Sequence, residues 1–233
     1  MSSTRRNGSA RSGGSYDNYP TPEWAIERFL EVWEDLEHVG SRWLEPCVDD
    51  GVIVEVVDRF KPGIDWRVCE LRDTRRSLRD AGLEKHQITI DDFFDAFPEP
   101  ADDGHVKPFD VAIFNPPFSL TMQFVERCLK ISKVVVCLQR LTFCGSDERN
   151  DFFVSKMPDV YVIPNRVSYT GDGRADSVEQ AWHVFGPHEL TEVGEMRVLA
   201  TTPADVRRAD FARCIAARGT RHGAVEDLFA EFE

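Results

Sequence analysis

The chain has 233 residues, a length typical of one full domain with at most a small appendage. Hydrophobic residues make up 42% of it, which excludes generalised disorder. The formal net charge of −13 argues against a protein that coats nucleic acid nonspecifically, because neutralising phosphates requires a basic face. No apolar run approaches the roughly 20 residues of a membrane span, and residues 1–14 lack the apolar core of an export signal. The sequence therefore predicts a cytoplasmic protein without membrane association.

The composition divides the chain into three parts. Residues 1–15 are small, polar and basic, and we expect them to form a disordered tail. Residues 16–200 carry the periodic apolar pattern of one folded domain. Residues 201–233 are predicted to form a C-terminal helical extension.

An amphipathic helix beginning near Pro22 is the first predicted element. Its apolar side chains recur at helical spacing, at Ile26, Phe29, Leu30, Trp33 and Leu36. Thr21 is predicted as the N-cap, because its hydroxyl can accept a hydrogen bond from an unpaired backbone N–H, and Pro22 as the first helical residue.

Four short apolar runs follow, and each ends in a carboxylate or an amide. They are Trp43–Glu45, Trp66–Glu70, Ile88–Asp92 and Val111–Asn115. Their last residues are 25, 22 and 23 positions apart, about the length of one strand, one helix and two loops. This rhythm predicts βαβ units and a parallel sheet, in which ligands bind beyond the carboxyl ends of the strands.

The second half of the domain continues this pattern. Further strands are predicted at Lys133–Leu138, Val160–Ile163, Gln180–Phe185 and Met196–Ala200. A helix over Thr121–Ile131 is predicted to turn four side chains inward: Phe124, Val125, Cys128 and Leu129. His183 is interpreted as a packed strand residue. The six cysteines are scattered without a CxxC pair, so no metal site is predicted.

The tetrapeptide Asn115-Pro116-Pro117-Phe118 directly follows an apolar strand and is the most specific motif in the chain. An adenine N6 amine is a poor nucleophile, because its lone pair is delocalised into the ring. The Asn115 side-chain oxygen and the Pro116 carbonyl can each accept one amine N–H and aim the lone pair at a methyl donor. The two prolines fix the turn.

The motif resembles that of the amino-methyltransferases, S-adenosylmethionine-dependent enzymes that methylate an exocyclic or amide nitrogen. The resemblance implies Asn115, Pro116, Pro117 and Phe118 as catalytic residues, with Phe118 stacking on a base flipped out of the duplex. It also implies a Rossmann-like class I methyltransferase fold, an α/β architecture with a mostly parallel sheet flanked by helices.

A second motif, Glu45-Pro46-Cys47-Val48-Asp49-Asp50-Gly51, resembles the cofactor loop of this superfamily, particularly that of phage-type adenine methyltransferases. Such a loop lets the backbone approach the methionine moiety while an acidic group meets its ammonium. Asp49 departs from the pattern, because it stands where the family usually has its first glycine. Asp tolerates positive φ better than most residues, but it adds a side chain and a negative charge.

Other segments follow the order of the family's motifs. Glu70 matches the acid that accepts the ribose hydroxyls, and Asp92-Phe93 matches the pair that contacts the cofactor adenine. Tyr19-Pro20-Thr21-Pro22 resembles the motif that closes over the methionine end. The implied S-adenosylmethionine-binding set is Tyr19, Thr21, Pro22, Glu45, Pro46, Cys47, Asp49, Gly51, Glu70, Leu71, Asp92, Phe93 and Asn115.

On the acceptor side, the segments 138–143, 164–170 and 176–185 look like the later segments of phage DNA adenine methyltransferases. The implied substrate-binding residues are Phe118, Arg140, Arg166 and Arg174. Only 186–233 remain for base recognition, so a homodimer is a hypothesis for supplying the missing DNA contact surface.

The resemblance favours methyl transfer from S-adenosylmethionine to adenine N6 in DNA. The same tetrapeptide could methylate a protein glutamine or an exocyclic amine in RNA, since both present a planar nitrogen. From another class, a degenerate methyltransferase fold could serve as a binding module with weak or no cofactor binding, which Asp49 motivates.

Overall fold

The computed structural model describes residues 21–100, 106–167, 178–186 and 194–210. The strands are β1 (Arg42–Glu45), β2 (Asp65–Glu70), β3 (Ile88–Ile90), β4 (Phe109–Phe114), β5 (Ser132–Arg140), β6 (Asp159–Ile163), β7 (Gln180–Phe185) and β8 (Met196–Val198). The α-helices are α1 (Glu23–Leu30), α2 (Val52–Phe60), α3 (Arg75–Asp80), α4 (Phe93–Ala96), α5 (Thr121–Ile131) and α6 (Asn150–Ser155). Short 3-10 helices are η1 (Glu34–Glu37), η2 (Lys85–Gln87), η3 (Phe118–Leu120), η4 (Leu141–Cys144) and η5 (Asp147–Arg149).

The strands form one mixed sheet in the order β3-β2-β1-β4-β5-β7-β6-β8. Strand β7 is antiparallel to both of its neighbours, and the other pairs are parallel. The predicted mostly parallel sheet is therefore confirmed. The carboxyl ends of β1, β2 and β4 meet at one edge, because the three strands are adjacent and parallel.

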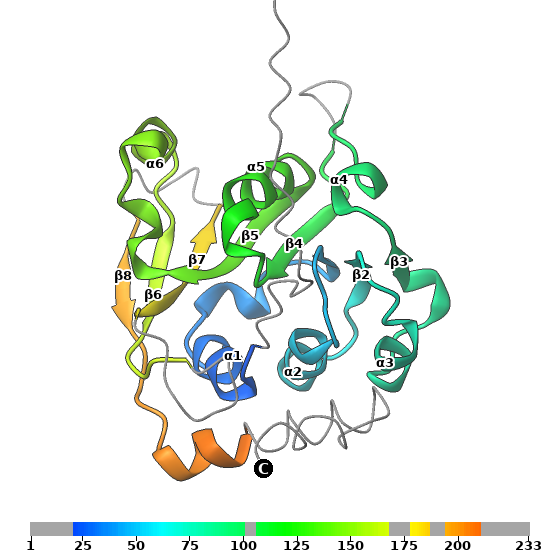
Figure 1. Cartoon of the computed structure of the whole chain (residues 1–233), viewed down its shortest axis with the longest axis horizontal. Helices are drawn as coiled ribbons and strands as arrows, with labels where there is room; N and C mark the ends of the chain where they lie inside the picture. Colours follow the sequence, from blue (N-terminus) through cyan, green and yellow to red (C-terminus); the bar gives the residue numbers. More distant parts are fainter. Residues whose placement is uncertain (1–20, 101–105, 168–177, 187–193, 211–233) are drawn as a thin grey trace, which may run out of the picture.

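Helices cover both faces of the sheet (Figure 1). Apolar side chains from α1, α2 and α3 pack on one face, where Trp43 and Trp66 meet edge to face at 5.6 Å. Side chains from α4, α5 and α6 pack on the other, where Phe93 stacks on Phe124 at 5.1 Å. Both faces are buried, so β4 is apolar along almost its whole length.

The N-terminal helix is shorter than predicted. Helix α1 ends at Leu30, and the chain continues through a turn into η1, although all five predicted apolar positions are buried. The predicted N-cap was also wrong. Pro22 is the N-cap, without a side-chain hydrogen bond, while the Thr21 hydroxyl accepts a hydrogen bond from the Asn115 amide. A tertiary partner thus replaces the local one.

Other boundaries differ by a few residues. Strand β3 ends at Ile90, because the Asp92 side chain accepts a hydrogen bond from the Phe94 backbone N–H and caps α4. Helix α5 has its predicted bounds, with Phe124, Val125 and Cys128 buried and Leu129 partly buried.

Residues 204–210 are helical and lie beside α1. The buried Asp210 carboxylate accepts a hydrogen bond from the Trp24 backbone N–H at 3.4 Å. Within the described ranges, no helix combines the length and apolar character needed to cross a bilayer.

Candidate active site

A cavity of about 340 Å³ lies at the carboxyl ends of β1, β2 and β4. Its lining combines residues of all three motif-bearing loops: Pro46, Cys47, Asp49, Glu70, Leu71, Arg72, Asp91, Asp92, Phe93, Phe94, Asn115, Pro116, Pro117, Ser119, Leu120 and Phe124. Most of the predicted cofactor set that the structure describes is therefore brought together in one place.

A second, larger cavity of about 540 Å³ lies beside α5 and α6. Its charged side chains include Lys130 and Glu99, which pair with each other at 2.7 Å. It contains neither the tetrapeptide nor the glycine loop, so we assign the candidate active site to the smaller cavity.

The glycine loop turns sharply between β1 and α2. Gly51 has φ +92°, and a Cβ there would lie 3.2 Å from that of Ala81, so only glycine fits without strain. Asp49 also lies in the left-handed region, at φ 50°, and is the only non-glycine residue with positive φ in the described ranges. This is a conformation that glycine adopts more readily than other residues.

Glu45 ends β1 and is 1% exposed. Burial raises the pKa of its carboxyl well above the usual value, and the charges of Asp50, Asp49 and Glu70 raise it further. One of its oxygens, Oε2, has no hydrogen-bond partner in the described part of the chain. A small cavity of about 20 Å³ next to it is also lined by Thr21 and Asn115. Burial and the neighbouring carboxylates therefore disfavour the charged form of Glu45.

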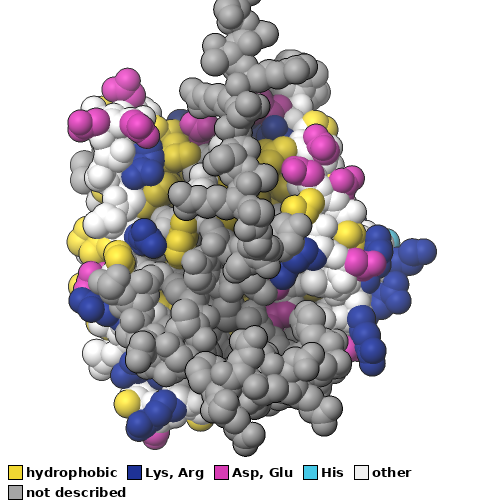
Figure 2. Space-filling model, viewed as in Figure 1, with side chains coloured by type: hydrophobic (Ala, Val, Ile, Leu, Met, Phe, Trp, Pro, Cys, Tyr) yellow, Lys and Arg dark blue, Asp and Glu magenta, His cyan; other side chains and the backbone are white. Residues whose placement is uncertain are grey.

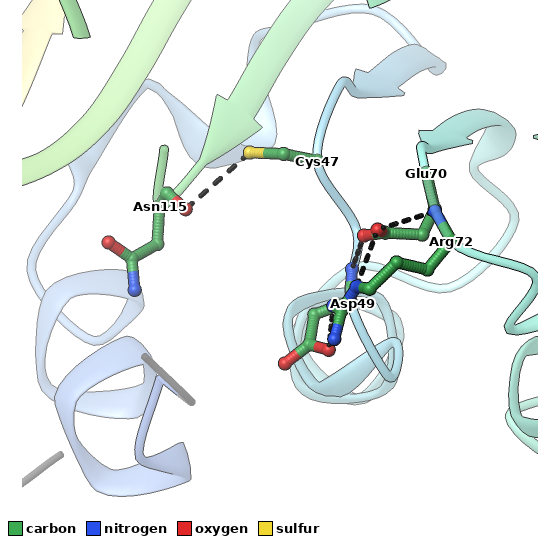
Figure 3. A network of polar contacts seen from close by, with 5 residues as sticks. All are labelled: Cys47, Asp49, Glu70, Arg72 and Asn115. Carbon is green, nitrogen blue, oxygen red and sulfur yellow. Dashed lines mark hydrogen bonds and ion pairs between the residues drawn. The ribbon is translucent and has the colours of Figure 1, made fainter. Parts of the chain in front are cut away.

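Arg72 bridges two of these carboxylates (Figure 3). Its Nη2 atom donates to Asp49 Oδ1 at 2.6 Å, and its Nε atom donates to Glu70 Oε1 at 3.0 Å. The backbone N–H of Asp49 donates to Glu70 Oε2 at 2.9 Å. The end of β2 and the glycine loop are thus joined through three residues.

The tetrapeptide begins directly after β4, on the far side of Cys47 from Arg72 (Figure 3). The Asn115 side-chain nitrogen donates to Thr21 Oγ1 at 3.0 Å. The Asn115 backbone carbonyl accepts a hydrogen bond from the Cys47 thiol at 3.5 Å. The Arg140 guanidinium lies 4.9 Å from the centre of the Phe118 ring. These contacts join the turn to the residue before Pro22, to the loop after β1 and to the end of β5.

Asp92 and Phe93 both line the cavity; Asp92 also caps α4, and Phe93 also packs in the second core. Arg166 is not among the lining residues and pairs with Glu179 at 2.8 Å on the surface. Tyr19 and Arg174 lie outside the described residues.

No family model matches the sequence, and no curated protein matches it. Solved structures do match. A type I restriction-modification system methyltransferase subunit from Streptococcus thermophilus has a TM-score of 0.58 at 12% identity, over 87% of this chain and 53% of that one. This chain thus spans about half of that subunit's length.

Two further structures are similar. A Listeria monocytogenes protein provisionally assigned as a class I S-adenosylmethionine-dependent methyltransferase has a TM-score of 0.54 at 13% identity, over 88% of this chain and 72% of that one. A Pyrococcus horikoshii protein provisionally assigned as an RNA methyltransferase has a TM-score of 0.53 at 15% identity, over 73% and 86%. The chain has the class I methyltransferase fold.

Within this methyltransferase fold, the cavity is lined by three polar residues that the sequence patterns did not single out: Arg72, Asp91 and Ser119. Arg72 stands two positions after Glu70, and a cation so close to a predicted ligand carboxylate was an available signal. In the described part of the chain, no three or more His, Cys, Asp or Glu side chains are grouped so that they could hold a metal ion.

Proposed function

We propose that this protein transfers a methyl group from S-adenosylmethionine to the N6 amine of adenine in DNA. The observation that carries the proposal is that Asn115 and Pro116 line the same cavity as Asp49 and Glu70. A turn that can hold an amine therefore opens onto a chamber suited to a cationic ligand. Neither group alone would distinguish this site from an ordinary loop at the end of a strand.

The cavity residues fit S-adenosylmethionine. Its sulfonium and ammonium groups are cations. The carboxylates of Asp49 and Glu70 line the cavity, and those of Glu45 and Asp50 line the small cavity beside it. Glu45 Oε2, which has no hydrogen-bond partner among the described residues, is an acceptor suited to a ligand N–H. The volume of about 340 Å³ lies in the range of small-molecule sites.

S-adenosylmethionine, when bound, supplies an electrophilic methyl group. The chain's own task is to hold the acceptor nitrogen. The Asn115 Oδ1 atom and the Pro116 carbonyl accept the two amine N–H bonds and draw the lone pair out of the ring. Thr21 fixes the amide by accepting from its nitrogen, which leaves the oxygen, Oδ1, as the amide atom that accepts from the amine. No strong base is required, because the amine becomes acidic once methylated.

Phe118 and Arg140 form the acceptor side. A guanidinium plane and a nucleobase plane both stack on an aromatic ring, so the Arg140 contact marks a surface that a flipped base can use. This favours a flat heteroaromatic amine over a glutamine side chain. DNA is favoured over RNA by the resemblance of the later segments to phage adenine methyltransferases.

Incubation with labelled S-adenosylmethionine tests the proposal. Unmethylated DNA, total RNA and lysate protein are offered separately, and each is digested and analysed by mass spectrometry, with the Asn115→Ala variant as control. We expect N6-methyladenine in DNA only. Label in RNA or in glutamine would support methyltransferase activity but would reject DNA adenine as the substrate. No label and no cofactor binding would favour the degenerate binding module.

Salt dependence gives a second test. Phosphate contacts release counterions, so the KM for DNA should rise as salt increases. A KM that does not change between about 50 and 200 mM salt would reject DNA as the substrate.

A further inference from the structure

The position of Asp49 poses a problem that the proposed function does not explain. Its left-handed backbone favours glycine, and its carboxylate adds charge to a cluster in which Glu45 is already buried among acids. An unpaired carboxylate beside Glu70 would repel it and push the two side chains apart.

Arg72 offsets the repulsion between Asp49 and Glu70, because its guanidinium lies between the two carboxylates and bonds to both. Its side chain is 32% exposed, whereas those of Asp49 and Glu70 are 24% and 8% exposed, so the three groups meet largely shielded from solvent. The guanidinium donates to both carboxylates through different nitrogens, and its own backbone N–H adds a hydrogen bond of 3.1 Å to Glu70 Oε1. Such a fork is specific to arginine, because lysine offers a single charge centre.

We propose that Arg72 is a positioning residue that makes Asp49 compatible with cofactor binding: it neutralises the carboxylate and holds the Glu70 carboxylate at the cavity wall. The inference rests on the proposed function, since it takes Glu70 as the carboxylate that the resemblance assigns to the ribose hydroxyls of S-adenosylmethionine. Asp49 and Arg72 then act as a pair that replaces the family's glycine.

A double-mutant cycle tests the pair. Calorimetry with S-adenosylmethionine is performed on the full chain and on Arg72→Gln, Asp49→Gly and the double variant. We expect Arg72→Gln to weaken binding about tenfold while Asp49 is present, and less than about threefold when position 49 is glycine. Arg72→Lys should recover part of the loss, because it restores charge but not the fork.

Arg76→Gln is the matched control. Arg76 is an exposed residue of α3, on a side of the molecule where basic side chains gather (Figure 2). The Arg76→Gln variant loses the same charge as Arg72→Gln. In the described part of the chain, however, Arg76 has no carboxylate partner like those of Arg72. Its cofactor affinity should match that of the unmodified protein. Thermal unfolding of every variant identifies loss of fold.

Steady-state kinetics separates an effect on cofactor positioning from a general loss of active protein. With the proposed substrate, Arg72→Gln should raise the KM for S-adenosylmethionine and leave kcat at saturation within about twofold. Equal losses of affinity in both backgrounds would overturn the pairing and leave the proposed function intact. If the unmodified protein binds no S-adenosylmethionine, the proposed function and this inference both fail.

Discussion

The side-chain amide of Asn115 donates a hydrogen bond of 3.0 Å to the hydroxyl of Thr21, a residue 94 positions earlier in the chain. Thr21 is buried, so solvent does not compete for this bond. The contact assigns the two ends of the amide: the nitrogen faces α1, and the oxygen is the end that can meet an acceptor amine.

Thr21→Val should therefore impair turnover without removing any group proposed to touch the amine. The valine is nearly isosteric but cannot accept the amide hydrogen bond, so Asn115 becomes free to rotate. We expect kcat to fall about tenfold. Steady-state kinetics measures this, and Thr21→Ser, which keeps the hydroxyl, should stay near the unmodified rate. Equal impairment in both variants would indicate a packing effect instead.

Substitutions of Asn115 and Glu70 should affect different properties: the first turnover, the second S-adenosylmethionine affinity. Asn115→Ala removes the acceptor for the amine, so turnover should fall at least about 100-fold while S-adenosylmethionine affinity stays within a few-fold. Glu70→Ala should weaken cofactor binding by about tenfold or more. Calorimetry and single-turnover assays separate the two effects. Parallel loss of both properties in Asn115→Ala would contradict its assignment to the acceptor.

Cofactor binding should strengthen as pH rises. Burial, and then the neighbouring carboxylates, raise the pKa of Glu45 in the free protein, and a cationic ligand nearby would lower it again. The complex then binds fewer protons than the free protein, so affinity increases with pH between the two pKa values. Calorimetry in buffers of different ionisation enthalpy should detect proton release, which Glu45→Gln should abolish.

His183 should make stability sensitive to mild acid. Its ring is fully buried in β7 and packs edge to face on Phe143 at 5.6 Å. Burial lowers its pKa to about 4, below the unfolded value of about 6.5. The folded-state pKa is depressed, so the stability contribution is present above about pH 6.5 and declines toward pH 4.

Urea unfolding at pH 7 and pH 5 measures this effect. The unmodified protein should lose roughly 1–2 kcal/mol more than His183→Leu over that interval, because leucine cannot take up a proton. The comparison with the variant cancels the contribution of the many carboxylates that titrate in both proteins. Equal losses would mean that His183 is not the responsible group.

Local patterns in the sequence predicted most of the elements. Period-two and period-3.6 apolar spacing depends only on nearby residues, which is why strands such as Gln180–Phe185 and the helix Thr121–Ile131 were obtained with their bounds. The regular spacing of Glu45, Glu70, Asp92 and Asn115 likewise predicted that their strands would end at one edge.

The tertiary structure decided which polar side chains pair. Thr21 is a residue type that is favoured at helix N-caps, yet its hydrogen-bond partner is the Asn115 amide. Only assembly of the sheet brings that amide within reach of Thr21. Gly40 and Asp110 show the same effect at the opposite end of β4. Asp110 pairs with Arg42 and Lys133, and a side chain at Gly40 would collide with its carboxylate.

The sequence by itself therefore determined the α/β pattern and the positions of the motifs, because hydrophobic periodicity and turn chemistry are properties of short segments. Only the tertiary structure decided that Arg72 joins Asp49 to Glu70 and that Thr21 orients Asn115. Such hydrogen bonds require atoms from distant segments to meet within about 3 Å at defined angles, and packing of the sheet and helices sets those distances.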